Sequence, residues 1–84
     1  MNARDALTTI RGLASANRYT LTGHAYDEMI AAGAQLGDVH HALVSARRTK
    51  RDGAGWLATG PDRDGDDLTM KVVLEDDMLV ITVW

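Results

Sequence analysis

The chain has 84 residues with nine Lys or Arg, twelve Asp or Glu, no cysteine and a formal net charge of −3. A domain of this size buries about 60–65 % of the surface that its unfolded chain exposes, so we do not expect a deep, enclosed substrate cavity. The lack of cysteine excludes disulfides and thiolate zinc sites. No apolar run reaches the length of a signal-peptide core or a membrane span, and we expect one soluble cytoplasmic domain over residues 1–84, without membrane contact.

The charges are unevenly distributed along the chain. Residues 1–51 carry seven Lys or Arg against four Asp or Glu, whereas residues 52–84 carry two against eight. The one basic cluster consists of Arg47, Arg48, Lys50 and Arg51. Nucleic-acid-binding proteins usually present a basic face, so the acidic total argues against such a partner and the local cluster argues for one. A solvated helix end would explain the same cluster, because cations are favourable at a helix C-terminus.

Three helices are predicted in the first half of the chain, where apolar residues recur at the i, i+3, i+4, i+7 spacing. Their predicted ranges are Ala3–Ala16, Gly23–Ala32 and Gln35–Ala46. The segment Tyr19–Thr22 is β-branched and aromatic, which predicts a short extended link whose Thr22 caps the second helix. The third helix is expected to bury Leu36 and to hold Arg47 and Arg48 in its last turn.

The C-terminal half has the two-residue alternation of strands. Leu68–Leu74 and Leu79–Val83 flank an acidic interruption and predict a hairpin, and Trp56–Thr59 predicts a strand before a long turn over residues 60–67. The expected aliphatic face consists of Leu68, Met70, Val72, Leu74, Leu79, Ile81 and Val83. We therefore expect an α+β domain whose N-terminal helices pack on one face of a small antiparallel sheet of about three strands.

Two groups of potential metal ligands do not have a metal-binding pattern. The aspartates at 62, 64, 66 and 67 alternate as in a calcium loop, but the glycine and the glutamate that such a loop requires are not at the required positions. His40 and His41 are adjacent on a helix, so their side chains diverge by about 100° and cannot share one metal as an i, i+4 pair would. We predict no metal site, and we interpret the aspartates as a polar turn.

The remaining polar residues suit one reaction that needs neither metal nor cofactor. They are His24, Tyr26, the basic cluster and Lys71. RNA cleavage through the ribose 2′-hydroxyl needs a base, an acid for the departing 5′-oxygen, and cations that stabilise charge on the phosphate. His24 lies in the first turn of the second predicted helix, where the helix dipole favours a neutral imidazole that can accept a proton. A structural histidine that hydrogen-bonds the sheet is the alternative interpretation of His24.

Several short motifs resemble a known family. The segments Thr22-Gly23-His24-Ala25, Met29, Asp38-Val39, Leu43, Gly60-Pro61-Asp62 and Val80-Ile81-Thr82-Val83 resemble the family DUF4258, which belongs to the RelE-like toxin folds. The helix over Ala3–Ala16 followed by Leu68–Val83 also resembles the motility quorum-sensing regulator (MqsR) toxin family.

The resemblance implies a compact sheet with helices on one side and the activity of a toxin in a type II toxin–antitoxin system. Such a toxin is an mRNA endoribonuclease, acting on free or ribosome-bound RNA and neutralised by a cognate antitoxin protein. Lys71 matches the lysine of the penultimate strand, Lys50 or Arg51 lies near the basic residue before the first sheet strand, and His24 matches the family histidine. We therefore predict His24, Lys50, Arg51 and Lys71 as catalytic and Tyr26, Arg47 and Arg48 as substrate-binding, with no cofactor.

A second hypothesis is a non-catalytic interaction module that keeps the toxin fold. Glu28 and Ala32 stand where the family often has arginines, and the tyrosine that follows the toxin tryptophan has no counterpart after Trp56. An exposed Trp56 or Trp84 would favour this hypothesis, because aromatic side chains often anchor protein interfaces.

Overall fold

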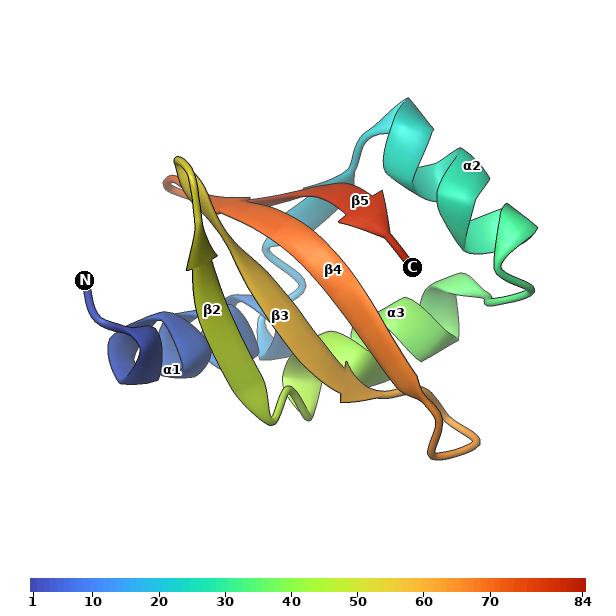
Figure 1. Ribbon diagram of the computed structural model, residues 1–84, viewed down its shortest axis with the longest axis horizontal. Coiled ribbons are helices and arrows are strands. Elements are labelled where there is room, and N and C mark those ends of the chain that lie inside the picture. Colours follow the sequence, from blue (N-terminus) through green and yellow to red (C-terminus); the bar gives the residue numbers. More distant parts are fainter.

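The computed structural model describes all 84 residues as an α+β fold (Figure 1). Its elements are α1 (Ala3–Ser15), β1 (Tyr19–Leu21), α2 (Gly23–Ala31), α3 (Leu36–Val44), β2 (Arg48–Asp52), β3 (Gly55–Pro61), β4 (Asp67–Leu74) and β5 (Met78–Val83). The three helices lie close to their predicted ranges, and side-chain oxygens cap their first turns. Asn2 accepts from the Asp5 amide at 2.8 Å and Thr22 accepts from the Ala25 amide at 3.1 Å, as was predicted for Thr22.

The sheet has five strands in the order β1-β5-β4-β3-β2, and it is mixed because β1 runs parallel to β5. The prediction of about three antiparallel strands was therefore wrong. The segment predicted as a link pairs with Met78–Val80, nearly sixty residues away, and no local pattern encodes such a contact. The basic cluster does not end a helix, because α3 stops at Val44 and the chain continues as β2. Four of the five β2 residues are exposed, so this edge strand has no apolar alternation to detect.

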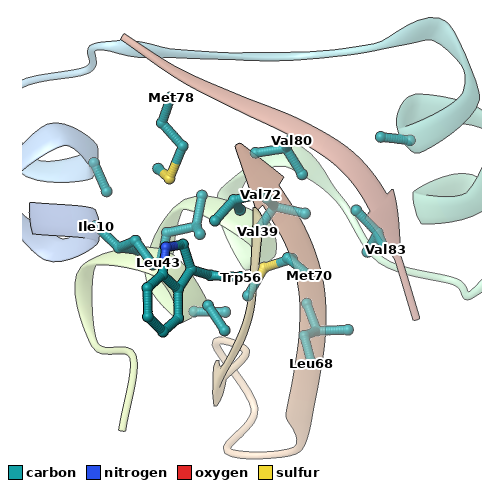
Figure 2. Close-up of a cluster of buried hydrophobic side chains, with 14 of the residues drawn as sticks. Ile10, Val39, Leu43, Trp56, Leu68, Met70, Val72, Met78, Val80 and Val83 are labelled. Atoms are coloured by element: carbon teal, nitrogen blue, oxygen red, sulfur yellow. The ribbon is translucent and has the colours of Figure 1, made fainter. Parts of the chain in front are cut away.

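All three helices cover the same face of the sheet, and one buried cluster joins the two layers (Figure 2). In β4, alternate residues point into this layer, and Leu68, Met70 and Val72 are buried there. The helices contribute Ala6, Ile10, Ala14, Ala25, Met29, Val39, Ala42 and Leu43, and the strands contribute Trp56, Ala58, Leu68, Met70, Val72, Met78, Val80 and Val83. The opposite face has no covering layer, and it is the face toward the viewer in Figure 1, with α1 and α3 crossing behind it. We call it the open face.

The predicted aliphatic face was wrong for Leu79 and Ile81 of β5, whereas Val83 is buried as predicted. A register shift beside Lys71 and Val72 inserts one extra residue in β5, so that Val80 lies opposite Val72 and Val83 opposite Met70. In the part of β5 that precedes the shift, the buried side chains are therefore those outside the predicted aliphatic face. Met78 and Val80 are buried, whereas Leu79 is 37 % exposed. A bulge of this kind changes the face of every residue on one side of it.

Of the two tryptophans, Trp84 is 56 % exposed, whereas Trp56 is buried and cannot anchor an interface. One further expectation about burial was wrong. Leu36, which was expected to be buried, is the first residue of α3 and is 52 % exposed. No helix combines the length and the apolar character needed to cross a bilayer.

Candidate nucleic-acid interface

The strand register places two lysines in one row across the open face. Leu57 of β3 lies opposite Lys50 of β2 on one side and opposite Lys71 of β4 on the other. Residues directly opposite on neighbouring strands point to the same face, and the neighbours of Lys71 in its strand, Met70 and Val72, are buried among the helices. Lys50 and Lys71 therefore share the open face. Neighbouring strands lie about 4.8 Å apart, so the two backbones are about 10 Å apart.

Two residues away along each strand, a second row on the open face adds a cation and two hydroxyls. Arg48 lies opposite Thr59, and Thr59 lies opposite Thr69. These residues, with Lys50, Leu57 and the backbone of β2, line a shallow hollow of about 300 Å³. The hydroxyls of Thr59 and Thr69 are 3.0 Å apart, so one donates to the other and one O–H remains free to donate. The hollow is thus lined by two cations, a free hydroxyl donor and no carboxylate, which is the lining that suits a phosphate oxygen.

Lys71 is held in place by the hairpin that joins β2 to β3. Its Nζ donates to the backbone oxygen of Asp52 at 2.9 Å and to Oδ2 of the same residue at 2.8 Å. The Lys71 side chain is only 22 % exposed, so its ammonium has a fixed position. The Asp52 carboxylate also brings a possible proton acceptor to the open face.

The other arginines of the basic cluster lie at one end of the open face or behind it. Arg47 and Arg48 approach the two oxygens of Asp67 at 3.3 and 3.8 Å. Arg51 lies opposite Trp56 and stacks over its ring at 5.1 Å, on the helix side of the sheet. Its Nε donates to Gly53 O at 3.1 Å. The structure therefore groups Lys50 and Arg48 with Lys71, and it separates Arg51 from them.

The two predicted site residues of α2 do not join the lysines. His24 pairs with Glu28 at 3.2 Å, and Glu28 also accepts from the Val83 amide at 3.3 Å. Tyr26 lines a separate groove of about 390 Å³ on the helix side, with Asn17, Tyr19, Leu21 and Leu36. His24 therefore has no phosphate-binding cation beside it that would support its predicted catalytic role. In the same region, the Tyr19 hydroxyl is 2.7 Å from Nδ1 of His40. Burial raises the pKa of this hydroxyl.

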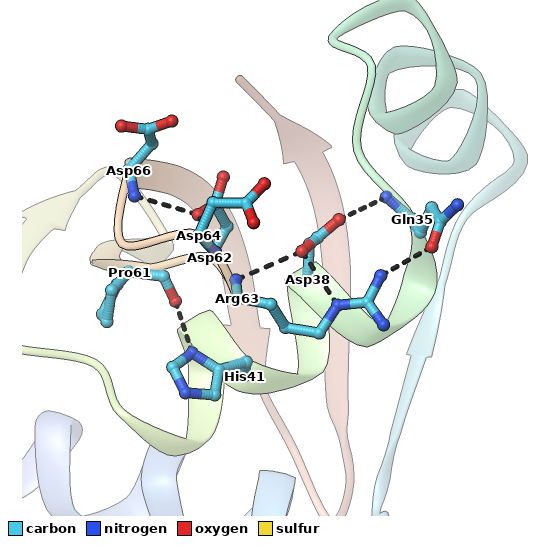
Figure 3. A network of polar contacts seen from close by, with 8 residues as sticks. All are labelled: Gln35, Asp38, His41, Pro61, Asp62, Arg63, Asp64 and Asp66. Atoms are coloured by element: carbon cyan, nitrogen blue, oxygen red, sulfur yellow. Dashed lines mark hydrogen bonds and ion pairs between the residues drawn. The ribbon is translucent and has the colours of Figure 1, made fainter.

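The acidic turn between β3 and β4 is fixed by an arginine (Figure 3). Asp62 Oδ1 accepts from the amides of Asp64 and Asp66, both at 2.9 Å. Arg63 reaches back to the start of α3. Its Nε donates to Asp38 Oδ1 at 3.0 Å, and its Nη2 donates to Oε1 of the N-cap residue Gln35 at 2.6 Å. The hydrogen bond from Arg63, with backbone amides of Gln35 and Arg63, lowers the pKa of Asp38 to about 2. These carboxylates close a turn and cap a helix.

Sequence reasoning missed three residues of the open face, namely Asp52, Thr59 and Thr69. Each is an ordinary turn or strand residue by its type, and only the pairing of β2, β3 and β4 brings them beside the lysines. The polar alternation of Thr69 and Lys71 in a strand was the one signal that could have indicated a polar sheet face. No protein-family model and no curated protein matches the chain.

Proposed function

We propose that this chain is a toxin-type endoribonuclease that binds single-stranded RNA on its open face and cleaves it without a metal ion. The observation that carries the proposal is the row in which Lys50 and Lys71 flank Leu57, with the hollow of about 300 Å³ beside Lys50. An uncovered sheet face of this kind admits an extended polynucleotide, as single-stranded RNA commonly binds to sheet surfaces. The substrate would be mRNA in the cytoplasm, free or on the ribosome, and a cognate antitoxin protein would neutralise the enzyme.

The residues of the open face can supply the three requirements of cleavage. The Asp52 carboxylate takes the proton of the 2′-hydroxyl, and the 2′-oxygen attacks phosphorus. The P–O5′ bond breaks, the Lys71 ammonium donates a proton to the departing oxygen, and a 2′,3′-cyclic phosphate remains. Lys50 and Arg48 stabilise the charge that develops on the phosphate oxygens. Asp52 and Lys71 are already 2.8 Å apart, so the proton left on Asp52 can return to Lys71.

Incubation of the purified protein with an RNA oligonucleotide in excess chelator tests the proposal. We expect fragments ending in 2′,3′-cyclic phosphate, and no cut at a site whose 2′-hydroxyl is replaced by hydrogen. Lys71→Ala should lower the cleavage rate by about 10²–10⁴, the usual contribution of one proton-transfer group. Arg4→Ala removes an exposed cation from α1 and is the matched control, for which we expect the wild-type rate.

The alternative is an interaction module without catalysis, and two observations favour it. Trp84 is 56 % exposed and can anchor a protein interface. The Lys71 ammonium already has a carboxylate partner, and His24 lies in the helix layer, so no histidine stands beside the lysines. Intact RNA after long incubation, with a folded protein that still forms a stoichiometric complex with a partner protein, would support this alternative. Cleavage that survives in Lys71→Ala and disappears in His24→Ala would place the active site on α2 and contradict the open-face mechanism.

A further inference from the structure

The outer edge of β2 has free backbone hydrogen-bonding groups. Asp52 and Gly55 flank a two-residue loop, in which Gly53 has the positive φ of +58° that tight hairpins need, so these two residues form a hydrogen-bonded pair. Hydrogen-bonded and non-bonded pairs alternate in antiparallel sheets, and Lys50 is therefore bonded to Leu57. The N–H and C=O groups of Thr49 and Arg51 consequently point away from β3.

No strand pairs with this edge, and α1 packs against β2 from the helix side. β2 is the last strand in the sheet order, and it lies at the margin of the sheet in Figure 1. Its residues are exposed except for Thr49, whose hydroxyl donates to Ala3 O at 2.6 Å on the helix side. Five residues in extended conformation span about 17 Å, which is sufficient for a further strand to pair. The other sheet edge, at β1, has only three residues and no comparable cluster of cations.

The charges along the edge select the kind of strand that can pair. Arg48 and Lys50 project on the open face and Arg51 on the helix side, so cations lie on both sides of the free backbone. Lys50 has no ion pair, and Arg48 is 3.8 Å from Asp67. Cations on an edge strand repel a second copy of the same edge, because like charges directly opposite destabilise a strand pair. A strand rich in carboxylates would instead gain both backbone hydrogen bonds and ion pairs.

We infer that β2 is a docking edge for an acidic, extended peptide segment, which adds to the sheet as a sixth strand. Backbone hydrogen bonds to Thr49 and Arg51 fix the segment, and its carboxylates contact Arg48 and Lys50 on one face and Arg51 on the other. The docked segment would pair with Arg48 and Lys50, the two cations that line the hollow proposed to bind RNA. The consequence that such a segment inhibits RNA binding rests on the proposed function, whereas the docking itself does not.

Amide hydrogen exchange with an acidic probe tests the docking. The probe is a peptide of about seven alternating glutamate and valine residues, long enough to span β2, with a lysine–valine peptide as the charge control. We expect the acidic peptide to slow exchange at the amides of Thr49 and Arg51, and the basic peptide to leave them unchanged. Equal protection by both peptides, or protection at β1 instead of β2, would overturn the inference.

A matched pair of variants separates backbone pairing from charge attraction. Thr49→Pro removes the outward N–H, whereas Thr49→Val keeps it and removes only the hydroxyl. We expect Thr49→Pro to weaken acidic-peptide binding about tenfold in fluorescence anisotropy, and Thr49→Val to bind like the wild type. Equal affinities of the two variants would contradict strand addition. Should Thr49→Pro not fold, Lys50→Glu replaces it, with loss of acidic-peptide binding expected and retained binding contradicting the inference.

Competition with RNA distinguishes failure of this inference from failure of the proposed function. Displacement of a bound oligoribonucleotide by the acidic peptide supports both. Peptide binding with protected β2 amides in a protein that neither binds nor cleaves RNA supports the docking edge and overturns the proposed function. Protection of Thr49 and Arg51 by the oligoribonucleotide and not by the peptide overturns the docking edge alone.

Discussion

At the scale of single residues, the polar side chains of this protein act through partners far away in the sequence. Thr22 as a helix cap was predictable, because a cap depends on residues within one turn. The first-turn position of Asp38 was also predictable, but its partner Arg63, 25 residues later, was not. The same holds for Lys71 and Asp52, which are 19 residues apart. The charged residues can be recognised by type in the sequence, but only the fold determines which of them meet.

The Asp38–Arg63 pair predicts a pH-dependent stability. The pKa of Asp38 is lowered from 3.8 to about 2, chiefly by the hydrogen bond from Arg63, so the folded state favours the ionised carboxylate. The resulting stabilisation is fully present above the ordinary pKa of the carboxyl and is lost as the pH falls through about 2. Asp38→Asn should therefore lower Tm by several degrees near pH 6, and the difference from the wild type should shrink steadily between about pH 4 and pH 2.

Thermal unfolding at a series of pH values checks this prediction. Arg63→Gln should reproduce the loss near pH 6, because it removes the other partner of the same pair. A Tm difference between Asp38→Asn and the wild type that is constant from pH 6 to pH 2 would show that ionisation of Asp38 does not stabilise the fold.

At the scale of elements, the fold could be predicted wherever a pattern is local. Helical periodicity located α1, α2 and α3, and strand alternation located the β4–β5 hairpin. The prediction failed at β1 and β2, which are edge strands with too little apolar alternation, and at the bulge in β5, which no residue type marks. Packing between elements also depends on positions that look unremarkable in sequence, and Gly60 is the clearest of them.

Two glycine-to-alanine substitutions should have opposite effects on stability. A Cβ at Gly60 would collide with the Ala42 backbone oxygen, where α3 crosses β3, so Gly60→Ala should destabilise the protein by about 3 kcal/mol or more. Gly12 lies in α1 with open space around it, and Gly12→Ala should stabilise the helix by about 0.5–1 kcal/mol. Urea unfolding measures both changes in the free energy of unfolding. Similar effects of the two substitutions would contradict the close approach of α3 and β3.

At the scale of the whole molecule, placing all helices on one side of the sheet leaves the other side uncovered. The net charge of −3 gives no indication of this face, because many carboxylates gather in the turns at 62–66 and 75–77, away from the Lys50 row. The cationic residues of the face could be predicted by type and through the family resemblance. Their arrangement could not, since it depends on the register of three strands.

RNA affinity should depend on salt through the open-face cations. Contacts of Arg48, Lys50 and Lys71 with phosphates predict a slope of about −2 for log Kobs against log salt concentration, from about −0.7 per contact on a single strand. Lys50→Ala should reduce the slope by about 0.7, whereas Arg4→Ala should leave it unchanged. Fluorescence anisotropy with a labelled oligoribonucleotide at several salt concentrations measures the slopes. Equal slopes for Lys50→Ala and the wild type would exclude Lys50 as a phosphate contact.

The most direct measurement of the RNA-binding surface is NMR chemical-shift mapping with an oligoribonucleotide that cannot be cleaved because each 2′-hydroxyl is replaced by a methoxy group. We expect the shifts to concentrate at Lys50, Leu57, Thr59, Thr69 and Lys71, and His24 and Tyr26 on α2 to be unaffected. Shifts confined to α2 and the groove around Tyr26, with the open face unchanged, would contradict the proposed RNA-binding surface.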